Sequence, residues 1–317
     1  ALVAVNTSDS FTNPSGRLAV VDLDGKAEVA SCDLGGQPDS VARAKDGSFV
    51  AIAIENERDE EVNDGALPQM PAGFVVRLPL KDGLPDCAAL QKIEMTGLGP
   101  EAADDPEPEY VSINEAGEIV VTLQENNGIA VIGADGAVAA HFPAGAVTLE
   151  GVDATDERGA LLFTQTLADV PREPDAVAWI DDSHFATANE GDWKGGSRGF
   201  TIWSKDGSVV YESGPAFELA VAKIGHYPDK RSDAKGIEPE TVAFARYGET
   251  PILFVGAERG SVVGVYDLTD LAAPKLMQIL PSGIGPEGLL ALPARNLFVT
   301  ANEVDLGADG GARSHVM

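Results

Sequence analysis

The chain has 317 residues, of which 44% are hydrophobic, enough for a buried core, and this excludes a wholly disordered protein. Its 22 Lys and Arg residues stand against 51 Asp and Glu residues, and the formal net charge of −29 argues against nucleic acid as a partner. No run approaches the roughly 18 consecutive apolar residues that a membrane helix needs, so no membrane span is predicted.

Short segments rich in Val, Ile, Leu, Phe and Thr follow one another along the chain, and helix signals are nearly absent. The first three predicted strands lie within 2–9, 17–23 and 27–34. Asp-Gly dipeptides, which readily adopt the positive φ of a tight hairpin turn, recur between strands. They are Asp24-Gly25, Asp46-Gly47, Asp82-Gly83, Asp135-Gly136 and Asp206-Gly207. The sequence therefore predicts an all-β chain of many short strands.

A unit that starts with a proline and an acidic residue recurs five times, and its second strand ends in a polar pair. These Pro–acid corners are Pro38-Asp39, Pro108-Glu109, Pro174-Asp175, Pro239-Glu240 and Pro286-Glu287. The polar pairs are Glu55-Asn56, Glu125-Asn126, Asn189-Glu190, Glu258-Arg259 and Asn302-Glu303. The acid and the glutamate of the pair are 15 to 18 residues apart in every copy (39 and 55, 109 and 125, 175 and 190, 240 and 258, 287 and 303). This spacing indicates two adjacent antiparallel strands of nearly constant length.

A third strand follows most units, and several show a fourth, more polar one. The third strands are predicted at 73–80, 128–136, 199–207 and 261–268, and the fourth at 88–95, 209–214 and 275–283. Four antiparallel strands in a repeated unit are typical of a β-propeller blade. We therefore predict one β-propeller domain over residues 1–317, with six blades favoured over seven, whose first blade lacks its first strand. Because the last unit stops where its third strand begins, either the first and last pieces complete one another or the natural chain continues past residue 317.

Cys32 and Cys87 lie in or beside apolar segments, which suits a disulfide and two buried thiols equally well. The chain opens on a strand pattern without a signal peptide. That opening suits a mature exported protein and equally a cytoplasmic one.

The first strand of each blade lines the central channel of a propeller, so the corners and polar pairs are expected to gather carboxylates near one axis. Oxygen donors without thiols or imidazoles suit hard cations, Ca²⁺ before Mg²⁺. The predicted metal ligands are Asp39, Glu55, Glu109, Glu125, Asp175, Glu190, Glu240, Glu258, Glu287 and Glu303. The alternative is that each acid only caps backbone N–H groups at a blade corner.

Because acidic residues are so common in this chain, its few basic residues give more specific information about a binding site. Arg198 and Arg313 lie in Gly-rich turns, and Arg231 and Lys235 precede a Pro–acid corner. Such residues can hold a phosphate or carboxylate, or they can form salt bridges between blades. No G-x-S-x-G motif occurs, so a serine hydrolase is unsupported.

Several motifs in order, from about Gln37 to the C-terminus, resemble the bacterial choice-of-anchor I propeller family. They are EPEYV, VTLQENNGIAVI, REPDAVAW, FATANEGD, GGSRGFTIW, RSDAKGIEPETV, GPEGLL and FVTANEV. The resemblance implies a propeller that is exported or displayed on the cell surface, often described as alkaline-phosphatase-like and sometimes joined to an esterase-like phytase domain. It also implies that Arg198, Arg231 and Lys235 hold a phosphate while a metal polarises it. The chain departs from the family in lacking the N-terminal closing strand, in stopping early, and in its loop 59–73.

Two functions are therefore expected. The first is an extracytoplasmic, Ca²⁺-dependent phosphoesterase acting on a small phosphorylated substrate. The alternative is a non-catalytic secreted or surface propeller that binds or assembles with a protein partner.

Overall fold

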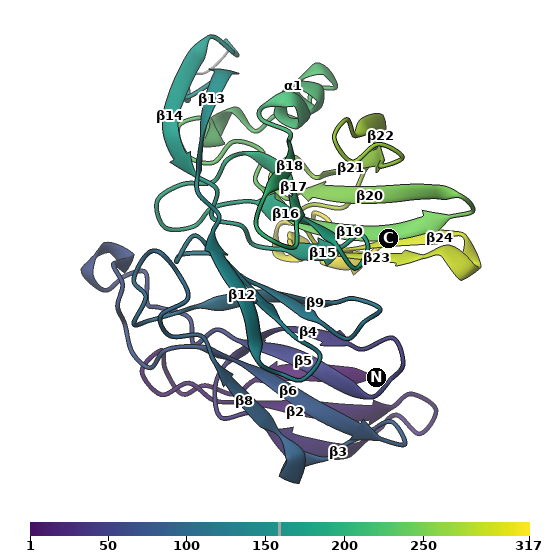
Figure 1. The fold of residues 1–317 in the computed structure, drawn as a ribbon. Helices are drawn as coiled ribbons and strands as arrows, with labels where there is room; N and C mark the ends of the chain where they lie inside the picture. The colour runs from purple at the N-terminus through teal and green to yellow at the C-terminus, as the bar shows by residue number, and fades with distance from the viewer. Residues whose placement is uncertain (158–159) are drawn as a thin grey trace. The chain divides into compact units, whose positions relative to one another are not determined.

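The computed structural model describes residues 1–157 and 160–317. The chain forms two compact units, Ala1–Ala144 and Gly145–Met317, and each is taken by itself below. The regular secondary structure of the described residues is almost entirely antiparallel sheet, with one α-helix and a few 3₁₀ turns (Figure 1).

The first unit contains three sheets. The first sheet has the order β1-β2-β3, from strands Leu2–Asn6, Gly16–Asp22 and Ala27–Asp33. The second has the order β4-β5-β6-β7 with β8 also paired to β6, from strands Pro38–Arg43, Phe49–Ile54, Phe74–Lys81, Leu84–Pro85 and Gln91–Glu94. The third has the order β9-β10-β11-β12, from strands Pro108–Ile113, Ile119–Leu123, Gly128–Ile132 and Val138–Pro143.

The second unit begins with a two-stranded hairpin, β13 (Ala146–Val152) and β14 (Gln165–Pro171). Its first blade is β15 to β18, from strands Val177–Trp179, His184–Asn189, Gly199–Ser204 and Val209–Glu212. Its second is β19 to β22, from strands Pro239–Tyr247, Thr250–Ala257, Val262–Asp267 and Lys275–Pro281. Its last sheet is β23 to β25, from strands Pro286–Leu292, Leu297–Asn302 and His315–Val316.

The six blade-like sheets confirm the predicted all-β propeller architecture and the preference for six blades. The first and last sheets have three strands instead of four. This agrees with the prediction that the first piece lacks a strand and that the last stops as its third strand begins. The description of the chain as one domain stays a prediction.

The hairpin β13–β14 and the helix α1 were not predicted, and both are insertions between blades, while the strands β7 and β12 within blades were not predicted either. The hairpin β13–β14 was missed because its strands are largely exposed and carry no Pro–acid corner. The helix α1 (Ala216–Lys223) has only eight residues and buries Phe217 and Val221, four positions apart. A pair at that spacing in so short a segment is too weak a periodic signal to distinguish from strand alternation.

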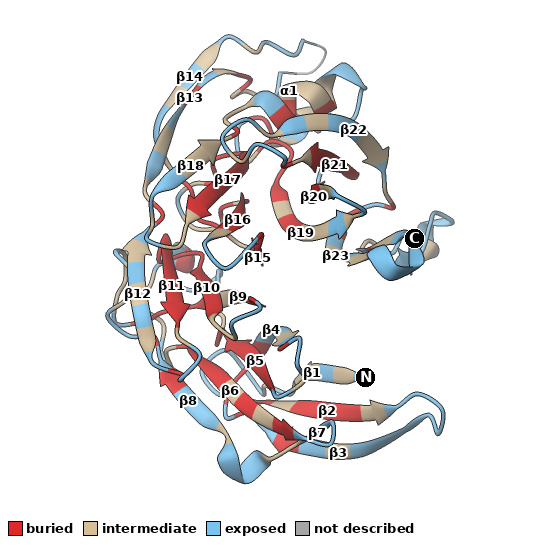
Figure 2. Ribbon diagram, turned by 45° about the vertical axis from the view of Figure 1, so that its right-hand side comes forward, coloured by how far each residue is buried: buried red, intermediate tan, exposed pale blue. Residues whose placement is uncertain are grey.

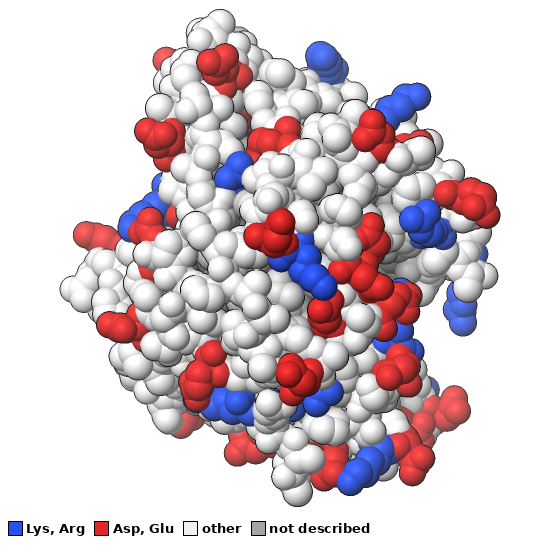
Figure 3. Space-filling view, viewed as in Figure 1, with Lys and Arg blue, Asp and Glu red and all other residues white. Residues whose placement is uncertain are grey.

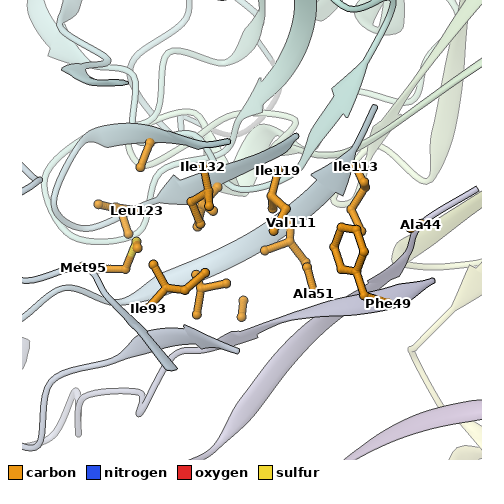
Figure 4. Close-up of a cluster of buried hydrophobic side chains, with 14 residues drawn as sticks. Ala44, Phe49, Ala51, Ile93, Met95, Val111, Ile113, Ile119, Leu123 and Ile132 are labelled. Carbon is orange, nitrogen blue, oxygen red and sulfur yellow. The ribbon is translucent and has the colours of Figure 1, made fainter. Parts of the chain in front are cut away.

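The core consists of the middle strands of neighbouring blades packed face to face. In the first unit, β5, β10 and β11 are buried along their whole length, whereas the outer strand β12 alternates between exposed and half-buried residues (Figure 2). Phe49, Ile93, Val111 and Ile119 belong to one buried cluster that joins the second sheet to the third (Figure 4). This packing places the first strands β4 and β9 next to each other, and both begin at Pro–acid corners.

A disulfide joins Cys32 on β3 to Cys87 in the turn before β8, with 5.5 Å between the Cα atoms. The sequence suited a disulfide and two buried thiols equally well, and the structure has the disulfide. The bond ties the first blade to the second. Among the described residues, no helix has the length and apolar character to cross a bilayer.

Candidate metal centres

The first acidic group lies in the first unit, where two neighbouring Pro–acid corners meet. It consists of Asp39 on β4, Glu55 directly after β5, and Glu109 on β9. One carboxylate oxygen from each residue lies within 4.8 Å of the others. Because Ca²⁺ accepts oxygen ligands at about 2.3–2.6 Å, two oxygens on one ion can lie as far as about 5 Å apart. The group therefore has dimensions that Ca²⁺ can bridge.

A serine hydroxyl holds the two corners together. The Ser40 hydroxyl donates to the backbone carbonyl of Glu109 at 2.8 Å and accepts from the backbone N–H of Val111 at 3.0 Å. This cross-blade contact stands one residue from Asp39 and positions β4 against β9. The spacing of the acids is thus set by backbone contacts independent of the carboxylates themselves.

Glu55 is the buried member of the group. Its exposed fraction is 8%, and within the described parts of the chain its carboxylate has no hydrogen bond and no ion pair. Burial is the main cause that raises the pKa of Glu55 well above its usual value, and the negative charges of Asp39 and Glu125 add to it. A carboxylate in this position needs either a proton or a cation to compensate its charge.

The neighbouring pair Glu107 and Glu125 is neutralised from within the protein. The buried Arg58 donates to Glu125 at 2.8 Å and lies 3.4 Å from Glu107. Burial raises the pKa of Glu107 to about 7, and the Arg58 charge opposes that rise. Glu125, one of the predicted metal ligands, therefore belongs to an internal ion pair and not to the acidic group around Glu55.

The second unit holds two acidic groups that share one residue. Glu190, Glu238 and Glu258 form the first, and Glu240, Glu258 and Glu287 form the second, again with ligand atoms within 4.8 Å of one another. Glu258 is 3% exposed, and burial raises its pKa to about 7 against the opposing charge of Arg259. Burial, the contact with Glu287 and the charge of Asp175 raise the pKa of Glu240, whose Oε2 atom is buried without a hydrogen-bond donor.

Basic side chains surround the first of these two groups. Lys235 Nζ lies 3.2 Å from Glu190 and donates to the carbonyl of Gly191 at 2.6 Å. Arg231 Nε lies 2.6 Å from Glu238. Arg259 contacts Glu238 at 3.1 Å and Glu258 at 2.6 Å. Two of the three predicted phosphate-binding residues, Arg231 and Lys235, thus lie beside carboxylates of one site.

Arg198, the third residue predicted to hold phosphate, lies elsewhere. It is 1% exposed and donates to the carbonyls of Asp153, Ser232 and Ala234 at 2.7–2.9 Å. Its guanidinium also lies 3.6 Å from the buried Glu218 of α1. In this structure Arg198 fastens the turn that carries Arg231 and Lys235, while Arg313 is exposed and lies 3.5 Å from Asp305. The four basic residues do not converge on one site.

The Glu218 carboxylate is expected to make stability depend on pH. Burial raises its pKa from 4.5 to about 7, opposed by the Arg198 charge. The folded chain then binds more protons than the unfolded chain between these two values, so the free energy of unfolding falls as the pH rises through that window. The full shift corresponds to on the order of 3 kcal/mol. Urea unfolding at about pH 5 and about pH 8 should show a smaller loss in Glu218→Gln than in the wild type; parallel pH slopes in the two proteins would contradict this.

The predicted ligands therefore separate into two sets. Seven lie in the three acidic groups: Asp39, Glu55, Glu109, Glu190, Glu240, Glu258 and Glu287. The other three are Glu125, Asp175 and Glu303. Glu125 pairs with Arg58, Asp175 lies near Glu240 without being one of the grouped residues, and Glu303 is exposed beside Gly285.

Sequence reasoning missed the glutamate that precedes the corner proline. Glu107, Glu173 and Glu238 are each at most 1% exposed. Glu107 contacts Arg58, Glu238 contacts Arg231 and Arg259, and Glu173 accepts backbone N–H groups of residues 192–194. The signal was present as the repeated Glu-Pro-acid triplet, but only the acid after the proline was considered.

The asparagine of the polar pair has a structural task. Asn56 accepts the backbone N–H of Gln37 at 2.9 Å, and Asn126 accepts that of Glu107 at the same distance. Each side chain thus closes the backbone turn in front of a Pro–acid corner. The sequence left open the alternative that the acids only cap backbone N–H groups at the blade corners. In these two blades the asparagine side chain makes that contact, so the adjacent glutamate is available for other contacts.

Comparisons with known proteins agree with this architecture. The choice-of-anchor I domain matches residues 1–195 and 193–271. No curated protein matches the chain. Solved structures with a similar fold include a protein from Lactobacillus plantarum (13% identity, TM-score 0.55, covering 99% of this chain and 81% of that chain). Others are the hydrazine synthase of Kuenenia stuttgartiensis (15%, 0.53, 95% and 77%) and a protein from Desulfotomaculum acetoxidans (10%, 0.53, 90% and 69%). At these identities the structures share the fold alone, whereas the domain match covers most of the sequence, and the chain belongs to the choice-of-anchor I domain family.

Proposed function

We propose that the chain is a Ca²⁺-binding propeller that works outside the cytoplasm. The observation that carries the proposal is Glu55, a buried carboxylate that has no basic partner among the described residues and lies within 4.8 Å of carboxylate oxygens of Asp39 and Glu109. All donors are carboxylate oxygens, which favours a hard cation, and Ca²⁺ tolerates irregular oxygen geometry better than the strict octahedron of Mg²⁺ does.

Other features of the chain indicate that the protein works where Ca²⁺ would occupy such a site. Acidic side chains are spread over the face shown in Figure 3, and the net charge of −29 draws cations toward the protein. The Cys32–Cys87 disulfide supports an oxidising compartment, such as the periplasm or the cell surface. Free Ca²⁺ is also abundant in those places, so weak sites could be occupied there.

The test is a calorimetric titration of the metal-stripped chain with CaCl₂ and, separately, with MgCl₂. We expect Ca²⁺ to bind and Glu55→Gln to weaken the site in the first unit at least tenfold, equivalent to about 1.4 kcal/mol. The glutamine keeps the shape of the side chain and removes only its charge. Binding should also raise the thermal unfolding midpoint, because the ion binds only the folded chain.

The matched control is Glu28→Gln, which removes one carboxylate from the same unit. Glu28 is exposed on β3, pairs with Arg17 and belongs to none of the acidic groups. Its substitution should leave the Ca²⁺ affinity close to that of the wild type. The proposal fails if the stripped wild-type chain takes up no Ca²⁺, or if Glu55→Gln and Glu28→Gln titrate alike.

Phosphate-ester hydrolysis is a second candidate, and one observation in the second unit favours it. Arg231 and Arg259 are 37% and 43% exposed and lie on Glu238, next to the group formed by Glu240, Glu258 and Glu287. A cation held by that group would compete with Arg259 for Glu258. The released guanidinium could then hold a small phosphorylated substrate while the cation lowers the pKa of a bound water.

This candidate demands metal dependence, because an acidic site without a cation would repel a phosphate ester. Hydrolysis of a phosphomonoester such as p-nitrophenyl phosphate should stop on chelation and return with Ca²⁺. Turnover that survives metal stripping would exclude this mechanism. Ca²⁺ binding without turnover would support the alternative, a binding or assembly module with a protein partner.

A further inference from the structure

The strongest unassigned feature is a cavity between the second and third blades, and none of the residues of the three acidic groups lines it. Its volume is about 210 Å³, and it lies entirely within the first unit. Its walls include Ala44, Ser48, Phe49, Arg77, Asn114 and Ala134. The lining thus combines a small apolar part with a larger number of polar and charged side chains, of which Arg77 is one.

Arg77 is the unusual member of this lining. It lies on β6, opposite Ala51 of β5 and Gln91 of β8, which fixes its backbone from both sides. Its guanidinium carbon lies 4.2 Å from the centre of the Phe49 ring. Phe49 is itself anchored in the core cluster (Figure 4). The guanidinium is therefore held in place by stacking on an immobile ring.

Despite this placement, no carboxylate among the described residues pairs with the Arg77 guanidinium. Within residues 1–157 and 160–317 its guanidinium has no hydrogen bond and no ion pair, and its Nε atom is buried without a partner. The other cationic residue at the cavity, Lys45, is paired with Glu115. In a chain with 51 acids against 22 bases, a partly buried guanidinium without an acidic partner calls for an explanation, such as water, an ion or a ligand.

The charge and shape of the cavity restrict what that ligand can be. A carboxylate is planar and can accept two parallel hydrogen bonds from the edge of a guanidinium. The charged residues of the lining, Lys45, Asp46, Arg77 and Glu115, cancel formally. A monoanion adds one charge to this balance, whereas a phosphate dianion would add a second beside Asp46 and Glu115. Ala44, Phe49 and Ala134 form a small apolar wall within a mostly polar lining, which suits a ligand whose apolar body is small.

We propose that this cavity binds a monocarboxylate with a small apolar body, anchored by Arg77 and seated against the wall next to Phe49. This site uses none of the residues of the acidic groups and does not depend on their binding a metal. The same chemistry would be offered by a small organic acid or by the carboxyl terminus of a peptide.

The test is a calorimetric titration of the full chain with sodium benzoate, the dipeptide Ala-Ala, the C-terminal amide of that dipeptide, and inorganic phosphate. We expect saturable binding of a carboxylate probe and at least tenfold weaker binding by Arg77→Gln. Binding of benzoate without the dipeptide identifies a small organic acid as the ligand class. Binding of the dipeptide but not its amide identifies a chain terminus.

Two further variants separate the anchor from a general charge effect. Arg246→Gln removes the same charge from an exposed strand residue in the second unit and should bind like the wild type. Arg77→Lys keeps the charge over Phe49 but loses the bidentate edge, so its affinity should fall while its thermal unfolding midpoint stays near that of the wild type. The proposal is overturned if neither carboxylate saturates, if phosphate binds more tightly than both, or if Arg77→Gln binds as well as Arg246→Gln.

Discussion

Replacing Arg58 with Met is expected to destabilise the chain by about 3–5 kcal/mol, the usual cost of removing one partner from a buried ion pair. Arg58 is 4% exposed, and it is the base that neutralises Glu107 and Glu125, both at most 3% exposed. Without it, two buried carboxylates face each other and the nearby Glu55. Urea unfolding at about pH 7.5, extrapolated to zero denaturant, measures the loss.

The control is Arg17→Met, which breaks an exposed ion pair with Glu28. Exposed pairs contribute roughly 0–1 kcal/mol, so this variant should unfold near the wild type. Lower pH should restore part of the stability of Arg58→Met, because protonation removes the repulsion. A loss no larger than that of Arg17→Met would show that water or rearrangement compensates the two acids, and the internal ion pair would then not be what organises this corner.

Removing the disulfide should produce the second large effect. Cys32 and Cys87 are separated by 55 residues, and closing a loop of that length restricts the unfolded chain by up to about 4 kcal/mol. The double variant Cys32→Ser/Cys87→Ser should therefore unfold at lower urea concentration than the oxidised wild type. The loss should fall within about 2–4 kcal/mol, because the first blade has three strands and depends on this link to the second.

The reduced wild type is the matched comparison for that variant. Both proteins lack the bond, so both should unfold at nearly the same urea concentration. The single variant Cys87→Ser also lacks the bond and should unfold at that concentration as well. If the oxidised chain and the double variant unfold alike, the bond does not stabilise the fold, and its support for an oxidising compartment becomes weaker.

Local patterns were enough to predict the blades. Each predicted third strand appears as a mostly buried strand, and the run 128–136 contains β11, which is buried along its whole length. Four of the five Pro–acid corners begin the first strands β4, β9, β19 and β23, because proline suits the edge of a sheet, where no inward N–H is needed, and the fifth lies just before β15. Among the exceptions, α1 and the hairpin β13–β14 are short or exposed insertions whose patterns do not repeat.

Partners could not be predicted in the same way. Glu55 and Glu125 occupy equivalent positions in neighbouring blades and both precede an asparagine. Glu125 meets Arg58, which comes from the loop between β5 and β6 of the preceding blade, whereas Glu55 meets Asp39 and Glu109. Nothing in the repeat distinguishes the two, since the difference comes from one residue in a loop outside it.

The sequence by itself determined the all-β class, the six blades, the family and the set of acids from which the three groups are drawn, because these depend on local spacing and turn chemistry. The tertiary structure alone decided which acids are neutralised by Arg58, Arg231, Lys235 and Arg259. It also decided that Arg198 is buried among carbonyls and that Arg77 forms no ion pair within the described part of the chain. The physical reason is the separation along the sequence of the residues that interact. A turn is made by a few consecutive residues, whereas an ion pair depends on which side chains from distant loops approach within about 4 Å in a medium of low dielectric constant.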